Sequence, residues 1–186
     1  ENGNQLHGGP NSLGTRIWDV KEDGDNLICE IFSPDGDNGF PGNLTMRVIY
    51  SLNGHGLHIE FEGETDKPTV FAPTFHPYFL TGGNCLDAKL QINAKEHLDV
   101  DEELIPTGKL LECEGKFDFT KMKKVESDLD DCFVTPDDYA VTLESGKSTM
   151  ELWTNFPAVQ VYTGIWLKEP FTKNYGIAIE PEAFPD

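Results

Sequence analysis

Basic side chains are few in this sequence. Against 33 Asp and Glu residues stand only 14 Lys and Arg residues, which gives a formal net charge of −19 at pH 7. Such a field repels a phosphate backbone and an anionic membrane surface. Arginine is especially rare, since Arg16 and Arg47 are the only two, so few groups could clamp a phosphate in a bidentate manner. We therefore expect no nucleic-acid partner and no membrane partner, and the charge also disfavours phosphorylated substrates.

Long apolar runs are missing as well. No stretch approaches the roughly 20 residues of a membrane span, and the N-terminus does not have the pattern of a signal peptide. The 4 cysteines include no Cys-x-x-Cys pair, which argues against a zinc site. An even number of cysteines would allow two disulfides, but we expect reduced and mostly buried thiols. The expected location is the cytoplasm, with a mature secreted protein as the alternative.

The periodicity of a long amphipathic helix is absent, and period-two patterns bounded by Gly, Asn, Asp and Pro dominate instead. The turn sequence Asn53-Gly54 between two such patterns predicts a hairpin, and the segment 116–131 is the best place for a short helical turn or irregular loop. The predicted strands cover 27–32, 46–52, 58–62, 69–71, 86–92, 139–143, 150–154, 159–163 and 176–179. Many short strands in 186 residues predict an all-β sandwich or barrel that forms a single domain over 1–186.

Three short segments contain candidate chemistry. They are Leu6–Gly9 (Leu-His-Gly-Gly), Thr74–Phe79 (Thr-Phe-His-Pro-Tyr-Phe) and Ile179–Glu182 (Ile-Glu-Pro-Glu). Together they contribute two histidines and a glutamate among Gly, Pro and aromatic residues. In a strand-rich chain this combination indicates a site for acid–base proton transfer.

The same segments, in the same order, resemble the motifs of the galactose mutarotase, or aldose 1-epimerase, family. Those motifs read Leu-His-Gly-Gly, then His-x-Tyr-Phe after a Thr, then Leu-Glu-x-Gln before a Pro-Asp. The resemblance covers nearly the whole chain and implies a large antiparallel β-sandwich, called a supersandwich, with a concave sugar-binding face. Family members are longer, so we expect an incomplete portion of that fold that lacks flanking strands at both ends and exposes strand edges.

Glu180 is the candidate general base. It follows the apolar run 177–179, so we expect it at a strand end and partly buried, where burial raises the pKa of a carboxyl. The resemblance implies the same role, because the catalytic glutamate of the family is the first acid of its last motif. Glu182 stands where the family has Gln; on a strand it would face the same side and raise one of the two pKa values further. The alternative is a solvated glutamate at a sheet edge.

His76 is the candidate general acid, because histidine exchanges a proton near physiological pH. Pro73 and Pro77 stiffen its backbone, and Tyr78 provides an apolar wall. The resemblance implies the same role, since the proton donor of the family is the histidine of His-x-Tyr-Phe, although Phe75 stands where Asn is usual. The alternative is a core histidine bonded to a backbone carbonyl.

His7 and Asp130 are the candidate substrate-binding residues. Two glycines follow His7 and would let the backbone pass close to a ligand. The resemblance implies that His7 orients the sugar; the alternative is a turn in which it merely caps. Asp130 opens the sequence Asp-Asp-Cys-Phe, which matches an Asp-His-Asn-Phe motif whose aspartate accepts hydrogen bonds from sugar hydroxyls. A solvated acidic loop is the alternative for Asp130.

Taken together, these residues predict an aldose 1-epimerase that interconverts the α and β anomers of a neutral hexose by acid–base ring opening and closure. The expected partner is a small aldohexose, and no metal, nucleotide or other cofactor is expected. Two alternatives remain: a hexose-6-phosphate 1-epimerase, and a carbohydrate-binding or sensing module that has the same fold without turnover. The intact pair of Glu180 and His76 favours an enzyme. The other histidines, His55, His58 and His97, are expected at the surface.

Overall fold

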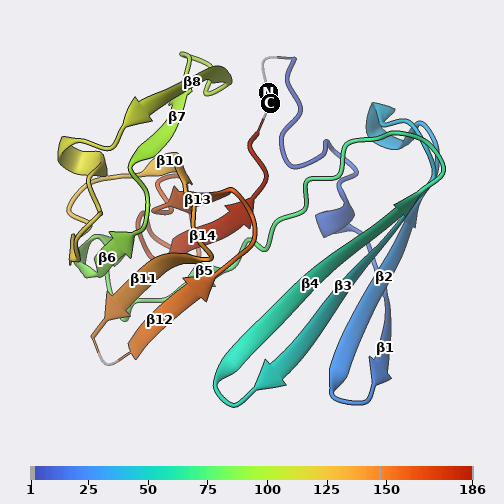
Figure 1. The fold of residues 1–186 in the computed structure, drawn as a ribbon, viewed down its shortest axis with the longest axis horizontal. Coiled ribbons are helices and arrows are strands. Elements are labelled where there is room, and N and C mark those ends of the chain that lie inside the picture. The colour runs from blue at the N-terminus through green and yellow to red at the C-terminus, as the bar shows by residue number, and fades with distance from the viewer. Residues whose placement is uncertain (1–2, 147, 186) are drawn as a thin grey trace. The chain divides into compact units, whose positions relative to one another are not determined.

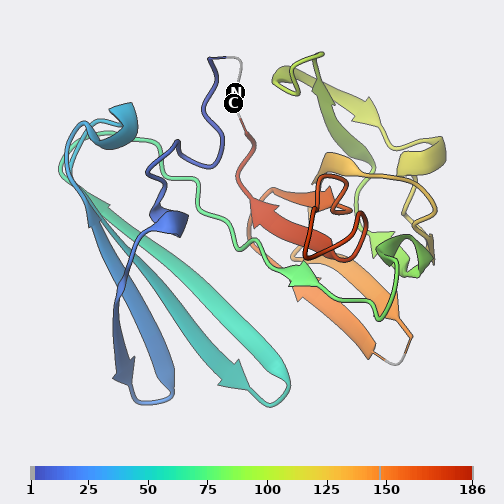
Figure 2. The same cartoon turned by 180° about the vertical axis from the view of Figure 1, so that it is seen from behind.

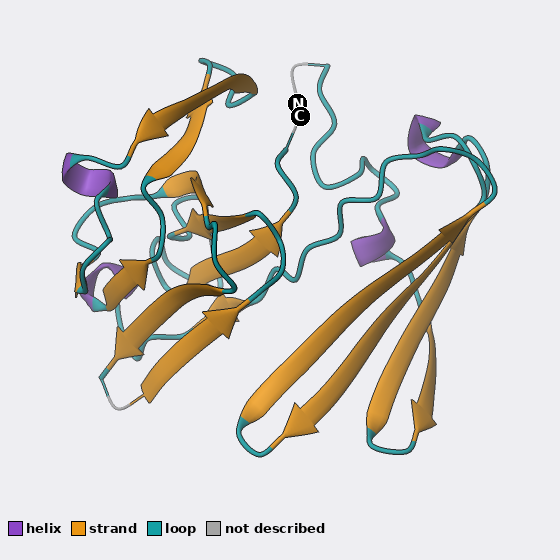
Figure 3. Cartoon of the chain, viewed as in Figure 1, coloured by secondary structure: helices purple, strands orange, loops and turns teal. Residues whose placement is uncertain are grey.

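The computed structural model describes residues 3–146 and 148–185, and the chain forms two compact units, residues 1–71 and 72–186. Strands are the main regular elements of each unit, while the helical segments are short 3-10 turns (Figure 3). Within the described residues, no helix has the length and apolar character that crossing a membrane requires. The all-β class is confirmed, and a single domain over 1–186 stays a prediction.

The first unit contains one antiparallel sheet with the strand order β1-β2-β3-β4 (Figure 1). Its strands are β1 (Asp19–Asp23), β2 (Asn26–Ser33), β3 (Leu44–Asn53) and β4 (Gly56–Thr65). The predicted hairpin is confirmed, because β3 and β4 pair from Leu44 with Thr65 to Asn53 with Gly56. Gly54 adopts a φ of 60° in the turn, a conformation that glycine reaches without steric penalty.

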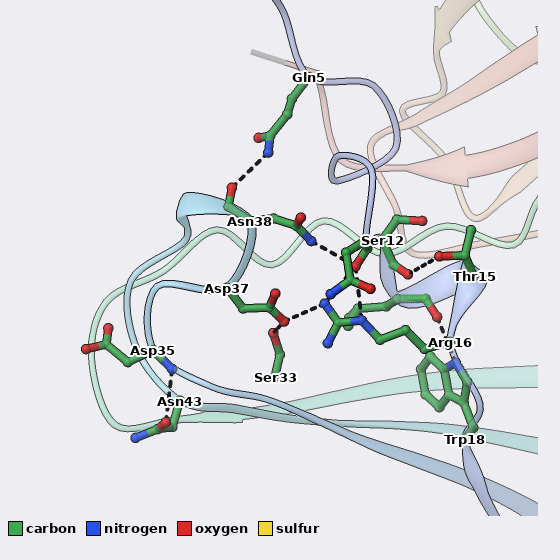
Figure 4. Close-up of polar contacts among 12 residues, drawn as sticks. Gln5, Ser12, Thr15, Arg16, Trp18, Ser33, Asp35, Asp37, Asn38 and Asn43 are labelled. Carbon is green, nitrogen blue, oxygen red and sulfur yellow. Dashed lines mark hydrogen bonds and ion pairs between the residues drawn. The ribbon is translucent and has the colours of Figure 1, made fainter.

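An ion pair ties the start of this unit to the connection between β2 and β3 (Figure 4). Arg16 follows the turn η1 (Leu13–Thr15) and donates to the carboxylate of Asp37, which opens the turn η2 (Asp37–Gly39). Ser33 donates to the same carboxylate oxygen at 2.7 Å. The hydrogen bond from Ser33, then that from Arg16, lowers the pKa of Asp37. One of the two arginines therefore has a structural role.

The second unit contains two antiparallel sheets, with the strand orders β5-β14-β13-β10-β7-β8 and β12-β11-β6-β9. In both views β14 lies between β5 and β13 (Figures 1 and 2). Two further 3-10 turns are η3 (Cys85–Asp87) and η4 (Gly115–Phe117). The strands are β5 (Tyr78–Phe79), β6 (Lys89–Ile92), β7 (Glu96–Val100), β8 (Pro106–Glu112), β9 (Lys123–Lys124), β10 (Asp130–Val134), β11 (Tyr139–Ser145), β12 (Ser148–Trp153), β13 (Ala158–Tyr162) and β14 (Ile177–Glu182).

One apolar core joins the two sheets of the second unit. The larger sheet contributes Phe133, Val159, Val161, Ile177 and Ile179, while the smaller sheet contributes Leu90, Ile92, Val141 and Leu143. In β13 and β14 every second side chain enters this core, which is the alternation of a strand with one buried face. The side chains between them must therefore point to the opposite face of the larger sheet.

Several sequence predictions differ from the structure. Residues 69–71 form no strand, because Pro68 and Pro73 flank them and cannot donate to a ladder. The strand predicted for 86–92 begins only at Lys89, after η3. His97 was expected at the surface, but it is only 5% exposed in β7 and stacks on Phe117 with 4.1 Å between ring centroids.

Candidate active site

The candidate base lies inside a strand. In β14, Ile177 and Ile179 enter the core, so Glu180 and Glu182 share the opposite face of the sheet. Glu180 is only 5% exposed. The predicted burial of Glu180 is confirmed, whereas its expected position at a strand end is wrong, because the strand continues to Glu182 beyond Pro181. The alternative, a solvated glutamate at a sheet edge, is therefore wrong for Glu180.

Strand register brings further polar groups to the same face. Gln160 of β13 pairs with Glu180 on one side and with Cys132 of β10 on the other. Tyr162, two residues after Gln160 and on the same face, pairs with Asp130 and with Ala178. Ala178 also pairs with Tyr78 of β5. Four neighbouring strands thus present one carboxyl-rich face, which we call the acidic face: Tyr78, Asp130, Cys132, Gln160, Tyr162, Glu180 and Glu182.

His76 reaches this acidic face from the segment that leads into β5. Its Nε2 lies 3.4 Å from Oε1 of Glu180, and its side chain is 30% exposed. The hydroxyl of Thr74 donates to the backbone oxygen of Pro181 at 2.9 Å, which holds the segment against β14. The ring of His76 also lies 5.5 Å from that of Tyr78. The sequence prediction paired His76 with Glu180 from their chemistry and from the family resemblance, and the structure places the two in contact.

Burial and like charge act together on Glu180. Loss of solvent contributes most, and the carboxyl groups of Glu182 and Asp130 add to it, so that the pKa of Glu180 rises to about 8. A carboxyl with this pKa is a stronger proton acceptor than an exposed one, and it holds a proton over much of the neutral range. Glu182 acts as the sequence predicted, from the same side of the strand.

Asp130 is the first residue of β10 and is half-buried. The alternative of a solvated acidic loop is therefore wrong for Asp130. Leu129, the preceding residue, is fixed by two hydrogen bonds with the hydroxyl of Thr163, at 2.9 and 3.1 Å. Burial raises the pKa of Asp130, while a hydrogen bond from Nε2 of Gln160 to its Oδ1, at 2.8 Å, opposes that rise. Asp130 is therefore an oriented hydrogen-bond acceptor beside Glu180.

Sequence reasoning missed Gln160 and Tyr162 and treated Tyr78 only as an apolar wall. Gln160 stands between Val159 and Val161, so the alternation of a strand could have placed it opposite the core. Tyr162 accepts a hydrogen bond from the backbone N–H of Trp166 at 2.7 Å, a contact that no local pattern predicts. Burial raises the pKa of both tyrosines, so each phenol keeps its proton at neutral pH.

His7 belongs to the first unit. Its backbone lies in a turn closed by a hydrogen bond from the N–H of Gly9 to the oxygen of Leu6, at 3.0 Å. His7 and Gly8 have φ values of 52° and 80°, as the central residues of a type I′ turn require. The exposed side chain of His7 could reach a ligand, and its role in the site stays a prediction.

Across the two described stretches, 3–146 and 148–185, no group of three or more His, Cys, Asp and Glu side chains is arranged to hold a metal ion. On the acidic face, Glu180 and His76 carry groups that exchange protons, and Asp130 carries a carboxylate that accepts hydrogen bonds.

Comparison with known proteins decides the family. The profile of the family described as aldose 1-epimerase matches residues 1–186. The chain belongs to the aldose 1-epimerase family. It is 33% identical to the aldose 1-epimerase of Haemophilus influenzae and 34% identical to that of Escherichia coli, in each case over 98% of this chain and 62% of the relative.

Solved structures agree with this assignment. A galactose 1-epimerase from Lactobacillus acidophilus superposes with a TM-score of 0.89 at 32% identity, over 97% of this chain and 62% of that one. An aldose epimerase homologue from C. elegans gives 0.88 at 28% identity, over 96% and 62%. The predicted mutarotase-like fold is thus confirmed. The chain spans about 62% of the length of these relatives.

Proposed function

We propose that this chain carries the acid–base site of an aldose 1-epimerase, which interconverts the α and β anomers of a neutral aldohexose. The observation that supports this most directly is the 3.4 Å contact between His76 and the buried Glu180. Both oxygens that exchange protons in this reaction, the C1 hydroxyl and the ring oxygen, are bonded to C1. A base and an acid that touch each other can therefore serve both oxygens of one anomeric centre.

In the proposed reaction, Glu180 as carboxylate takes the proton of the C1 hydroxyl while protonated His76 gives a proton to the ring oxygen. The bond between C1 and the ring oxygen breaks, which leaves an aldehyde, a protonated Glu180 and a neutral His76. The aldehyde turns about the C1–C2 bond. His76 then takes the proton back from the C5 hydroxyl as it attacks, and Glu180 returns its proton to the former aldehyde oxygen. The protons balance over the cycle.

The other groups of the acidic face are assigned to binding. Asp130, held by Gln160, would accept hydrogen bonds from sugar hydroxyls, and we propose His7 as a further residue that orients the sugar. A neutral hexose is favoured over a hexose phosphate, because three carboxyl groups line the face and the net charge is −19. A cytoplasmic location is part of the proposal, and the four free cysteines are compatible with it.

Polarimetry tests the activity. Pure α-D-galactose is dissolved, and its optical rotation is followed with wild-type chain, with Glu180→Gln and with His76→Asn. The wild type is expected to accelerate the approach to equilibrium, and each variant is expected to lose about 10²–10⁴-fold in kcat, as removal of a positioned acid or base does. Glu151→Gln, which changes an exposed carboxyl on β12, serves as the control for net charge.

Two other results would favour one of the alternative functions. Sugar binding by a folded wild-type chain without any acceleration would favour a carbohydrate-binding module of the same fold. Acceleration with a hexose 6-phosphate but not with the neutral sugar would favour a hexose-6-phosphate 1-epimerase.

A further inference from the structure

A second carboxyl lies close to the proposed base. Glu182 shares the outer face of β14 with Glu180, two residues further along, and is half-buried. At about 3.3 Å of rise per residue, such positions are roughly 7 Å apart along a strand. Two charges at this distance interact strongly when solvent is partly excluded, and the carboxyl of Glu182 does raise the pKa of Glu180.

The carboxyl of Glu182 has a partner of its own. Burial raises the pKa of Glu182, and a hydrogen bond from the thiol of Cys132, on β10, opposes that rise and so favours the ionised form. Cys132 and Glu182 come from strands on either side of β13, and the residue of β13 that pairs with Glu182 is Ala158. Ala158 is completely buried and clusters with Cys132, so a small side chain here leaves room for the thiol and the carboxyl to meet.

We propose that Glu182 is a positioning residue that strengthens Glu180 as a proton acceptor. An ionised Glu182, held by the Cys132 thiol, opposes the negative charge that Glu180 acquires when it loses its proton. The inference deepens the proposed function and depends on it for its catalytic meaning, but the electrostatic coupling itself exists with or without turnover.

Several groups face Glu180 besides Glu182, and any test must separate them. His76 and Tyr78 face it from β5 and the segment before it. Asp130 and Cys132 approach from β10. Between these strands, β13 contributes the neutral amide of Gln160 and the phenol of Tyr162. Substitution of Glu182 alone changes one charge and leaves these groups in place.

Carbon-13 NMR of the glutamate carboxyl groups gives the direct test. The resonance of Glu180 is assigned by its loss in Glu180→Gln and is then followed against pH in the full chain without sugar. In Glu182→Gln we expect its titration midpoint to fall by roughly 1.7 pH units, from the interaction of two charges roughly 7 Å apart at an effective dielectric constant near 20. Glu182→Asp, which keeps the charge, should retain most of the wild-type midpoint.

Two comparisons make the result decisive. Glu151→Gln removes an exposed carboxyl elsewhere and should leave the midpoint of Glu180 where it is in the wild type. A midpoint that moves no further in Glu182→Gln than in Glu151→Gln overturns the inference, and so does a Glu182→Asp variant that behaves like Glu182→Gln.

If Glu182→Gln fails to fold, Cys132→Ala provides a second test: it should raise the titration midpoint of Glu182, whereas Cys132→Ser should not. An unchanged midpoint in Cys132→Ala also overturns the inference.

The catalytic consequence is a change in the pH dependence of kcat/KM. In Glu182→Gln the acid limb should move to lower pH by the same amount as the NMR midpoint, and the rate at pH 9 should fall because Glu180 is then a weaker base. A wild-type chain without mutarotation would refute the proposed function, while the NMR midpoints would still decide the role of Glu182.

Discussion

Replacing the buried Glu180 with Gln should stabilise the chain increasingly as the pH rises. In the folded chain this carboxyl has a pKa of about 8, against an ordinary value of 4.5. A group with a raised pKa binds its proton more tightly in the folded state, so the fold is favoured at low pH. That advantage is lost as the pH rises through the window from about 4.5 to about 8.

The magnitude follows from the width of this window. A rise in the pKa from 4.5 to about 8 changes the free energy of unfolding by roughly 5 kcal/mol in total, at about 1.4 kcal/mol per pH unit. Between pH 5.5 and pH 9 the free energy of unfolding of Glu180→Gln should therefore increase, relative to that of the wild type, by about 3 kcal/mol. Gln has the same shape as the protonated carboxyl, so packing changes little.

Urea unfolding measured at several pH values checks this prediction, with Glu151→Gln as the exposed control. Taking the difference between variant and wild type removes the contribution of all other titrating groups. The reasoning would be refuted by a difference that stays constant from pH 5.5 to pH 9, because Glu180 would then have the same proton affinity in the folded and the unfolded chain.

Further predictions concern the site, the core and the thiols. Asp130→Asn should raise KM for galactose about 10- to 150-fold through loss of charged hydrogen bonds, as initial-rate polarimetry would show; an unchanged KM would remove Asp130 from the binding site. Phe133→Ala should lower the free energy of unfolding by about 3–5 kcal/mol in urea titrations, whereas Phe171→Ala, at a position 49% exposed, should lower it by less than about 1 kcal/mol; equal losses would contradict the assigned core. A thiol reagent at pH 8 should modify the half-buried Cys29 before Cys85, which is completely buried and whose pKa is raised to about 11 by burial; the reverse order would contradict this burial.

Strands with clear alternation were predictable from the sequence. The patterns at 46–52 and 58–62, joined by Asn-Gly, gave a hairpin that the structure confirms as β3 and β4. β8 was missed because its burial alternates little: nearly all its residues are exposed, so no apolar period marks it. β10 was missed because it opens with two acids, which are typical of loops, and only its place between β7 and β13 accounts for their burial.

The candidate site was predictable in its residue types but not in its geometry. A glutamate after an apolar run and a histidine between prolines could be selected from local sequence. Their contact depends on the pairing of β5 with β14, which is a tertiary feature. Gln160 and the thiol of Cys132 come from other strands, 20 or more residues from either glutamate in the sequence, and only the register of β10, β13 and β14 brings them beside the two glutamates.

Exchange NMR on equilibrated galactose tests the central claim most directly, because it detects interconversion of the anomers without depending on a pure starting anomer. We predict that the wild-type chain produces exchange cross-peaks between the α and β anomeric protons and that Glu180→Gln abolishes them while remaining folded. Cross-peaks of equal strength with Glu180→Gln would contradict the role of Glu180. Broadening of sugar resonances by the wild type, without cross-peaks, would contradict catalysis itself and leave a binding module.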